Sequence, residues 1–198
     1  MSVRPPLVLV HGLLDTPAVF SRLRQQLAGR GPVLLSPQLP LRFGRTPVRQ
    51  AALRLHQWIE TIAPGSGPLD VLGFSMGGVI ARTWIQQLGG QRRTRRFISL
   101  GSPQQGTWTA QPWSSRLFPG LADLKCGSDL LQELNSDLQG LRGVECYSFY
   151  SAVDLAVLPG WRAVLPVGTC RSLPVATHPQ LLRDDAALLP LAEELLRL

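Results

Sequence analysis

Ser75 stands where its hydroxyl could attack a carbonyl carbon. Residues 73–78 read Gly-Phe-Ser-Met-Gly-Gly, a G-x-S-x-G pattern. The apolar run 69–73 before the serine is typical of a buried strand, and residues 76–88 after it are typical of a helix. In such a strand-to-helix turn the serine is strained and its hydroxyl stands above the sheet, while glycines keep the turn uncrowded. The alternative is a glycine-rich corner that carries an inert serine.

A serine nucleophile needs a general base, and the chain contains three histidines. His178 lies in a proline-flanked loop between the last expected strand and the closing helix, so it can hang over the sheet edge that carries Ser75. We therefore expect His178 to be the base. His11 follows the first expected strand and is expected to form structural hydrogen bonds, whereas His56 lies within an expected helix, away from any motif.

A carboxylate must orient the base and stabilise its positive charge. Asp154 follows the expected strand 144–151, at the edge where parallel sheets place functional groups. The order Ser75, Asp154, His178 is the chain order that accompanies a serine in this kind of turn. The other aspartates are less suitable. Asp123, Asp129 and Asp137 lie in or near the long connection, in poorer positions, and Asp184 and Asp185 look like helix caps.

Two backbone N–H groups are expected to stabilise the oxyanion that forms when the serine attacks. One belongs to Met76, at the start of the helix whose dipole favours negative charge. The other is assigned to Leu13, in the loop His11-Gly12-Leu13-Leu14 that follows the first strand.

Short apolar runs alternate with helix-like stretches, which predicts an α/β fold with a doubly wound, mostly parallel sheet of about six strands. Residues 1–198 are expected to form one domain. The expected strands are 7–10, 33–36, 69–73, 97–100, 144–151 and 161–167. The expected helices are 16–28, one that opens at Thr46-Pro47 and stops at Pro64-Gly65, then 76–88, 128–138 and 184–198, the last interrupted or restarted near Pro190.

The connection 103–143 between the fourth and fifth strands is long for a compact domain, and such connections are more often functional than decorative. It emerges at the edge that carries Ser75. Three large apolar side chains of this connection, those of Trp108, Trp113 and Phe118, are expected to bind the substrate. Phe74 is expected to bind it as well, as the floor of the pocket. The alternative is a loop whose tryptophans are buried for packing alone.

The net charge of +7 comes almost wholly from arginine, since Lys125 is the only lysine. We expect no nucleic-acid partner, because the arginines are scattered and no nucleic-acid-binding motif accompanies them. The cluster Arg92, Arg93, Arg95 and Arg96 is expected at the sheet edge opposite Ser75, away from the substrate. A weak association of this cluster with a membrane surface is an open alternative.

Three cysteines without C-x-x-C spacing predict reduced, mostly buried thiols rather than disulfides or a zinc site: Cys126, Cys146 and Cys170. The apolar run 7–10 is too short for a signal peptide and precedes His-Gly rather than a small-residue cleavage site. No window holds the ~18 consecutive apolar residues of a membrane span. We therefore expect a cytoplasmic location.

Several segments together resemble the lipase and esterase branch of the α/β-hydrolases, and the compact Bacillus-type lipases without a cap domain are nearest in size. The matching segments are 10–12, 73–78, 100–103 and 150–154, followed by the late His178. The resemblance implies carboxylic-ester hydrolysis through a Ser-His-Asp triad and an acyl-enzyme intermediate, without a metal or an organic cofactor.

The expected function is therefore cleavage of a small-molecule or lipid ester that carries an apolar acyl group. A thioesterase or acyltransferase would use the same triad and the same acyl-enzyme step, so the sequence does not separate these activities. A non-catalytic binding module on a hydrolase scaffold is the alternative from another class.

Overall fold

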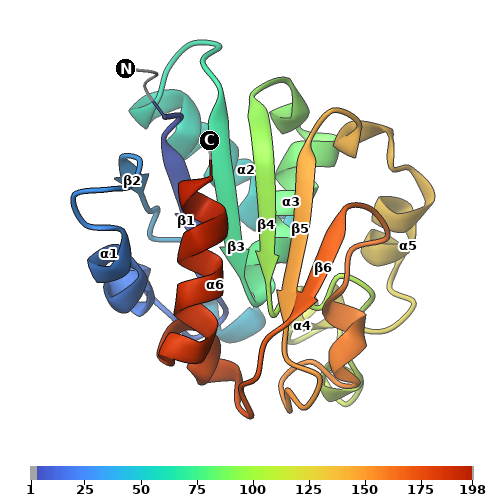
Figure 1. Cartoon of the computed structure of the whole chain (residues 1–198). Coiled ribbons are helices and arrows are strands. Elements are labelled where there is room, and N and C mark those ends of the chain that lie inside the picture. Colours follow the sequence, from blue (N-terminus) through green and yellow to red (C-terminus); the bar gives the residue numbers. More distant parts are fainter. Residues whose placement is uncertain (1–3, 198) are drawn as a thin grey trace.

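The computed structural model describes residues 4–197 of the chain. A six-stranded sheet forms its centre in the order β2-β1-β3-β4-β5-β6, and every neighbouring pair of strands is parallel (Figure 1). The carboxyl ends of the strands therefore share one edge of the sheet, the lower edge in Figure 1. The predicted parallel α/β architecture is confirmed. The strands are β1 (Leu7–Val10), β2 (Leu34–Leu35), β3 (Leu69–Phe74), β4 (Thr94–Leu100), β5 (Glu145–Tyr150) and β6 (Thr169–Ser172).

Helices cover both faces of the sheet. On one face α1 (Ser21–Leu27) packs beside α6 (Asp185–Leu196), which crosses the front of the sheet in Figure 1. On the other face α2 (Val48–Ile62) and α5 (Asp129–Ser136) flank α3 (Met76–Gln87). The single turn α4 (Pro119–Ala122) lies near the carboxyl edge of the strands.

The inner strands β1 and β3 read as nearly continuous apolar runs because both faces of the sheet are buried there. In β1, Leu7 and Leu9 belong to the hydrophobic cluster under α1 and α6, whereas Val8 and Val10 belong to the cluster under α2 and α3. All four side chains are fully buried.

Short 3₁₀ helices lie in the connections between these elements. They are η1 (Pro17–Phe20), η2 (Arg42–Gly44), η3 (Gly90–Arg92), η4 (Trp108–Ala110), η5 (Gln139–Leu141), η6 (Gly160–Ala163) and η7 (His178–Leu182). The predicted helix 16–28 is thus η1 followed by α1.

The prediction of a sixth strand at residues 161–167 is wrong. Those residues begin within η6, and the strand that pairs with β5 is β6, further along the chain. All four side chains of this edge strand are exposed. Because β6 is held by backbone hydrogen bonds rather than by a buried apolar face, its sequence shows no hydrophobic pattern.

The closing helix runs through Pro190 without interruption, contrary to the predicted break. Proline removes one backbone hydrogen bond from a helix. Here the helix persists because Leu188, Leu191 and Leu195 are buried against the sheet. The predicted helix also included Leu198, which lies outside the described residues. The second strand is shorter than the predicted 33–36.

A buried arginine of α3 fixes the long connection between β4 and β5 to the rest of the fold. Arg82 is fully buried, and its guanidinium donates hydrogen bonds to the carbonyl oxygens of Gln104 (3.3 Å) and Leu134 (2.6 Å). Burial lowers the pKa of Arg82 to about 10. Since the two carbonyls lie near opposite ends of the connection, one side chain determines where both ends sit.

The arginines of residues 92–96 have structural contacts at the amino-terminal edge of the sheet. Three of them pair with carboxylates: Arg93 with Glu60, Arg95 with Asp70 and Arg96 with Glu145. Arg96 is fully buried. Three of the four arginines in this cluster thus have carboxylate partners within the fold.

The three cysteines are unpaired, but only Cys146 is buried, and Cys170 on the edge strand is exposed. The prediction of mostly buried thiols is thus wrong for Cys170, because β6 has no covering layer on its outer side. Within residues 4–197, none of the helices has the length and apolar character needed to cross a bilayer.

Candidate active site

Ser75 occupies the turn between β3 and α3 in a conformation that residues with a Cβ rarely adopt, with φ 55° and ψ −131°. Its N–H donates to the carbonyl oxygen of Leu100 at 2.9 Å. Glycine is required on both sides of the serine: a Cβ on Gly73 would collide with the backbone of Gly78, and one on Gly77 would collide with the carbonyl oxygen of Val10. This is the geometry of a nucleophile elbow.

His178 and Asp154 form a close pair at the same edge of the sheet. The distance from His178 Nδ1 to Asp154 Oδ2 is 2.6 Å, and the aspartate side chain is 2% exposed. The second carboxylate oxygen accepts the N–H of Ala156 at 2.8 Å. A carboxylate held this way fixes the imidazole with its proton on Nδ1, which leaves Nε2 as the basic nitrogen.

The position of the His178 ring is defined from several sides. Its ring stacks on Phe74, the residue before the nucleophile, with centroids 4.8 Å apart. Its loop is closed by a capping box in which Gln180 Oε1 accepts the N–H of Thr177 at 2.8 Å. Nε2 is buried and has no hydrogen-bond partner among residues 4–197. His178 and Ser75 line the same cavity.

The other two histidines have structural partners. The Nδ1 of His11 donates to the carbonyl oxygen of Gly12 (2.8 Å), and its Nε2 accepts the N–H of Leu39 (3.0 Å). Burial lowers its pKa, which keeps the ring neutral. His56 accepts the indole N–H of Trp84 at 3.4 Å. Because Trp84 lies about 12 Å along α3 from the first residue of the helix, His56 is remote from Ser75.

The remaining candidate aspartates are occupied at helix ends. Asp123 accepts the N–H of Val48 at the start of α2, and Asp184 accepts the N–H of Ala186 at the start of α6. Asp129 stands in the first turn of α5, Asp137 accepts the N–H of Gln139, and Asp185 pairs with Arg22. None of these five side chains lines the cavity at Ser75, within the part of the chain that the structure describes.

Both residues expected to supply oxyanion donors lie beside the nucleophile. Leu13 and Met76 line the cavity, and the N–H groups of neither have an acceptor among the described residues. Gly12 brings the Leu13 loop close, since a Cβ on that glycine would lie 2.9 Å from Ser75 Cβ. The arrangement thus offers two unpartnered backbone donors near the serine hydroxyl.

A cavity of about 730 Å³ opens above Ser75. Phe74, Trp113 and Phe118 line it as predicted, and the last two pack edge to face with centroids 5.0 Å apart. Trp108 is not among the lining residues of the described chain and is 60% exposed, so its predicted role in substrate binding is not supported. The turn η4 directs this side chain outward. Further apolar lining comes from Leu14, Val19, Phe43, Leu121, Leu124, Leu155 and Val157.

Two cavity residues were missed although the sequence held a signal for them. Leu155 directly follows Asp154 at the end of the fifth strand, and Asp15 follows the predicted oxyanion loop. Position next to a predicted site residue would have been a sufficient reason to include both. Phe43 carried no such signal, because it reaches the cavity from a loop after β2 that has no motif.

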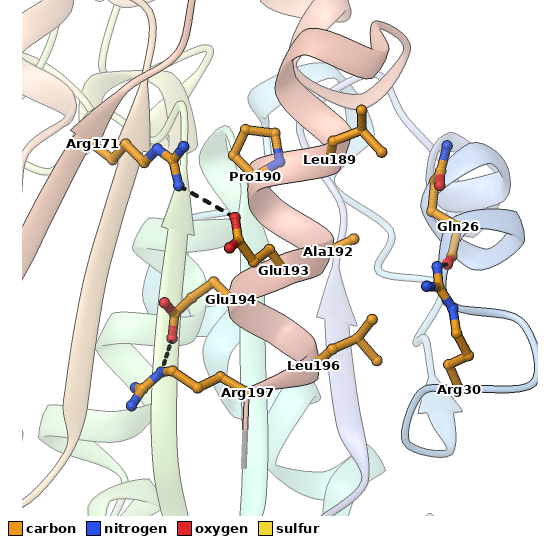
Figure 2. A pocket seen from close by; sticks show the side chains of 10 residues that line it. All are labelled: Gln26, Arg30, Arg171, Leu189, Pro190, Ala192, Glu193, Glu194, Leu196 and Arg197. Atoms are coloured by element: carbon orange, nitrogen blue, oxygen red, sulfur yellow. Dashed lines mark hydrogen bonds and ion pairs between the residues drawn. The ribbon is translucent and has the colours of Figure 1, made fainter.

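A second hollow, of about 640 Å³, lies between α1 and α6 (Figure 2). Ion pairs cross its surface, from Arg197 to Glu194 (2.8 Å) and from Arg171 to Glu193 (4.0 Å). It contains none of the predicted site residues. In residues 4–197, no group of three or more His, Cys, Asp or Glu side chains is arranged to hold a metal ion.

Comparison with known families agrees with this geometry. The model of the palmitoyl protein thioesterase family matches residues 6–150, which include β1 to β5 and the elbow at Ser75. The chain belongs to this family. Its fold is that of the α/β-hydrolases, as the lipase-like motifs predicted. The matched region ends before Asp154 and His178.

Among curated proteins, the chain is similar to lysosomal thioesterase PPT2 of Bos taurus (27% identity over 118 residues, 58% of this chain and 38% of that protein). The Homo sapiens PPT2 gives 28% identity over the same length, 58% of this chain and 39% of that protein. The matched region thus covers less than half of these relatives. Their activity is considered for this chain only as a proposal.

Solved structures establish the fold over nearly the whole chain. The Aspergillus fumigatus lipase B structure superposes with a TM-score of 0.77 at 18% identity, covering 98% of this chain and 53% of that one. The mature Bacillus licheniformis lipase BlEst2 gives a TM-score of 0.74 at 14% identity, covering 99% and 93%. The predicted likeness to compact Bacillus lipases is therefore confirmed at the level of fold.

Proposed function

We propose that this family member is a serine-dependent acyl hydrolase that cleaves a thioester or ester with a long apolar acyl chain. The observation that carries the proposal is the meeting of three groups at one cavity: the strained Ser75, the His178–Asp154 pair and a mainly apolar wall. Each group has a clear chemical task, and the combination suits acyl transfer from an apolar acyl group.

In the proposed reaction, Nε2 of His178 removes the Ser75 hydroxyl proton while Oγ attacks the acyl carbonyl carbon. The negative charge that develops on the carbonyl oxygen is stabilised by the N–H groups of Met76 and Leu13. Asp154 stabilises the imidazolium that forms. Collapse of the tetrahedral intermediate returns the proton to the leaving thiolate or alkoxide, and water then hydrolyses the acyl-serine by the same route.

The cavity supports a preference for a long acyl chain. Its volume of about 730 Å³ is in the range of small-molecule sites, and most of its lining side chains are apolar. Each buried methylene contributes about 0.8 kcal/mol, which corresponds to about a fourfold gain in kcat/KM if it is realised in the transition state. We expect kcat/KM to rise with chain length until the cavity is full.

Family membership favours a thioester as the physiological bond. A carboxylic ester is the second candidate, because the lipase-like motifs around Ser75 and Asp154 suit that substrate and both bonds pass through the same acyl-enzyme. The two substrates differ in the leaving group, which the cavity wall does not select in an evident way.

The test is a matched series of acyl-thioesters and p-nitrophenyl esters, from acetyl to palmitoyl, with Ser75→Ala as the control. We expect turnover that rises with chain length in at least one series and disappears in the control, together with covalent labelling of Ser75 by a fluorophosphonate. Absence of both turnover and labelling would refute the proposed function and favour a binding module.

A further inference from the structure

Large apolar side chains stand exposed around the mouth of the cavity. Leu14 is 72% exposed, Phe43 74% and Leu155 72%, and all three line the cavity. Leu117, in the loop between Trp113 and Phe118, is 61% exposed. Single exposed apolar residues are common, but several gathered at one opening mark an interaction surface.

Phe43 is exposed by a backbone that is unfavourable for residues with a Cβ. Arg42 and Phe43 are consecutive residues in the left-handed region, with φ 48° and 55°. The turn is closed by hydrogen bonds from the N–H of Gly44 and the N–H of Thr46 to the carbonyl oxygen of Leu41 (3.0 and 3.3 Å). Strain of this kind occurs at functional sites more often than elsewhere, and here its effect is to present an aromatic ring at the mouth.

Positive charge accompanies the exposed apolar side chains. The loops at the mouth carry five arginines and two acidic residues: Asp154, which is buried against His178, and Asp15, which lines the cavity beside Leu14. Four of these arginines are exposed and have no ion pair with any residue in 4–197: Arg42, Arg45, Arg116 and Arg183. The loops in question are residues 11–16, 41–47, 107–121, 153–163 and 178–183.

We propose that these side chains form a docking surface for an anionic phospholipid bilayer. The surface, called the mouth rim below, consists of Leu14, Phe43, Leu117 and Leu155 with Arg42, Arg45, Arg116 and Arg183. Apolar side chains insert at the boundary between headgroups and acyl chains, while guanidinium groups bind phosphate oxygens. Docking would direct the cavity toward the bilayer, so that an acyl chain anchored there enters without crossing water.

Docking concerns the surface at which the protein reaches its substrate, so vesicle binding tests it separately from catalysis. Binding of the Ser75→Ala protein to sedimenting vesicles of phosphatidylglycerol is compared with binding to vesicles of phosphatidylcholine. We expect stronger binding to phosphatidylglycerol, and weaker binding to it as salt is raised.

Two variants probe the mouth rim without touching residues that line the cavity. Each arginine near an anionic surface contributes about fivefold to partitioning, so the double change Arg42→Gln with Arg116→Gln should weaken vesicle binding about 25-fold. Leu117→Asp should weaken it as well. The matched controls are Arg30→Gln with Arg142→Gln, and Leu189→Asp on α6, which should bind like the parent protein. Thermal melting verifies that each variant is folded.

The same variants are then made in the protein that retains Ser75, and their turnover of a soluble short-chain thioester is measured. This assay separates the docking proposal from the proposed function. Unchanged turnover with lost vesicle binding supports the docking surface. Equal binding to the two lipids, or equal losses in the control variants, would overturn it while leaving the proposed function intact. Docking would also be refuted if the rim variants bound vesicles normally but lost turnover of a soluble acylated peptide, because the rim would then recognise the peptide.

Discussion

In an Asp154→Asn variant, an amide would replace the carboxylate that holds His178. The N–H of Ala156 donates to one oxygen of Asp154 at 2.8 Å, so the asparagine carbonyl oxygen would remain at that position. Its NH₂ group would then face Nδ1 of His178, 2.6 Å from the present oxygen. Because Nδ1 must then accept a hydrogen bond, the proton of the neutral ring moves to Nε2, the atom that has to receive the proton of Ser75.

The expected loss in kcat is about 10⁴-fold, the size measured for this change in another serine hydrolase, and it equals about 5 kcal/mol of transition-state stabilisation. KM for a short-chain substrate should change little, since Asp154 is buried and does not line the cavity. The assay is steady-state turnover of a soluble thioester, with the rate of fluorophosphonate labelling as a second measure of nucleophile activation.

Asp184→Asn is the matched control, because it makes the same chemical change at the start of α6. It should leave kcat unchanged, and the loss of charge at the helix cap should cost at most about 1 kcal/mol of stability. If Asp154→Asn kept kcat within tenfold of the parent, the assignment of Asp154 as the orienting carboxylate would be wrong.

Three further predictions follow from the site. Ser75→Ala and His178→Ala should each lower turnover by about 10³-fold or more with the fold intact by circular dichroism, and near-normal turnover in either would remove that residue from the mechanism. Trp113→Ala should lower kcat/KM more for palmitoyl than for acetyl substrates, whereas Trp108→Ala, outside the cavity, should not; equal effects of chain length in both would point to packing alone. Burial lowers the pKa of His11 from 6.5, so below pH 6.5 the unfolded chain binds a proton that the folded chain does not. The free energy of unfolding should therefore be highest above pH 6.5, as far as His11 is concerned, and fall as the pH drops below that value. Urea unfolding on both sides of pH 6.5 should show a smaller fall for His11→Gln, and an equal fall would assign the effect to other groups.

The sequence predicted the elbow and its partners because local chemistry determines them. A strained serine between a strand and a helix requires glycines at fixed spacing, and parallel strands bring Asp154 and the loop of His178 to the same edge. The role of His11 was likewise predicted from its position at a strand end. These features depend on a few residues whose neighbours in space follow from the topology.

Features set by tertiary contacts could not be predicted in this way. The edge strand β6 lacks a buried face, so it leaves no hydrophobic pattern. Trp108 and Trp113 lie five residues apart in a connection without regular periodicity, and only the turn of η4 decides which of them faces the cavity. The left-handed backbone of Phe43 is likewise imposed by the surrounding turn, since nothing in its residue type favours it.

The attachment of the long connection through Arg82 has a consequence for protein engineering. The proposed reacting groups come from the β3–α3 turn and from the segments after β5 and β6, whereas much of the cavity wall proposed to bind the acyl chain comes from residues 103–143. Chain-length selectivity could therefore be exchanged by transplanting that connection as a cassette while the reacting groups stay in place. A successful transplant must keep backbone carbonyls where Gln104 and Leu134 now present theirs, because otherwise the buried guanidinium would lose its acceptors.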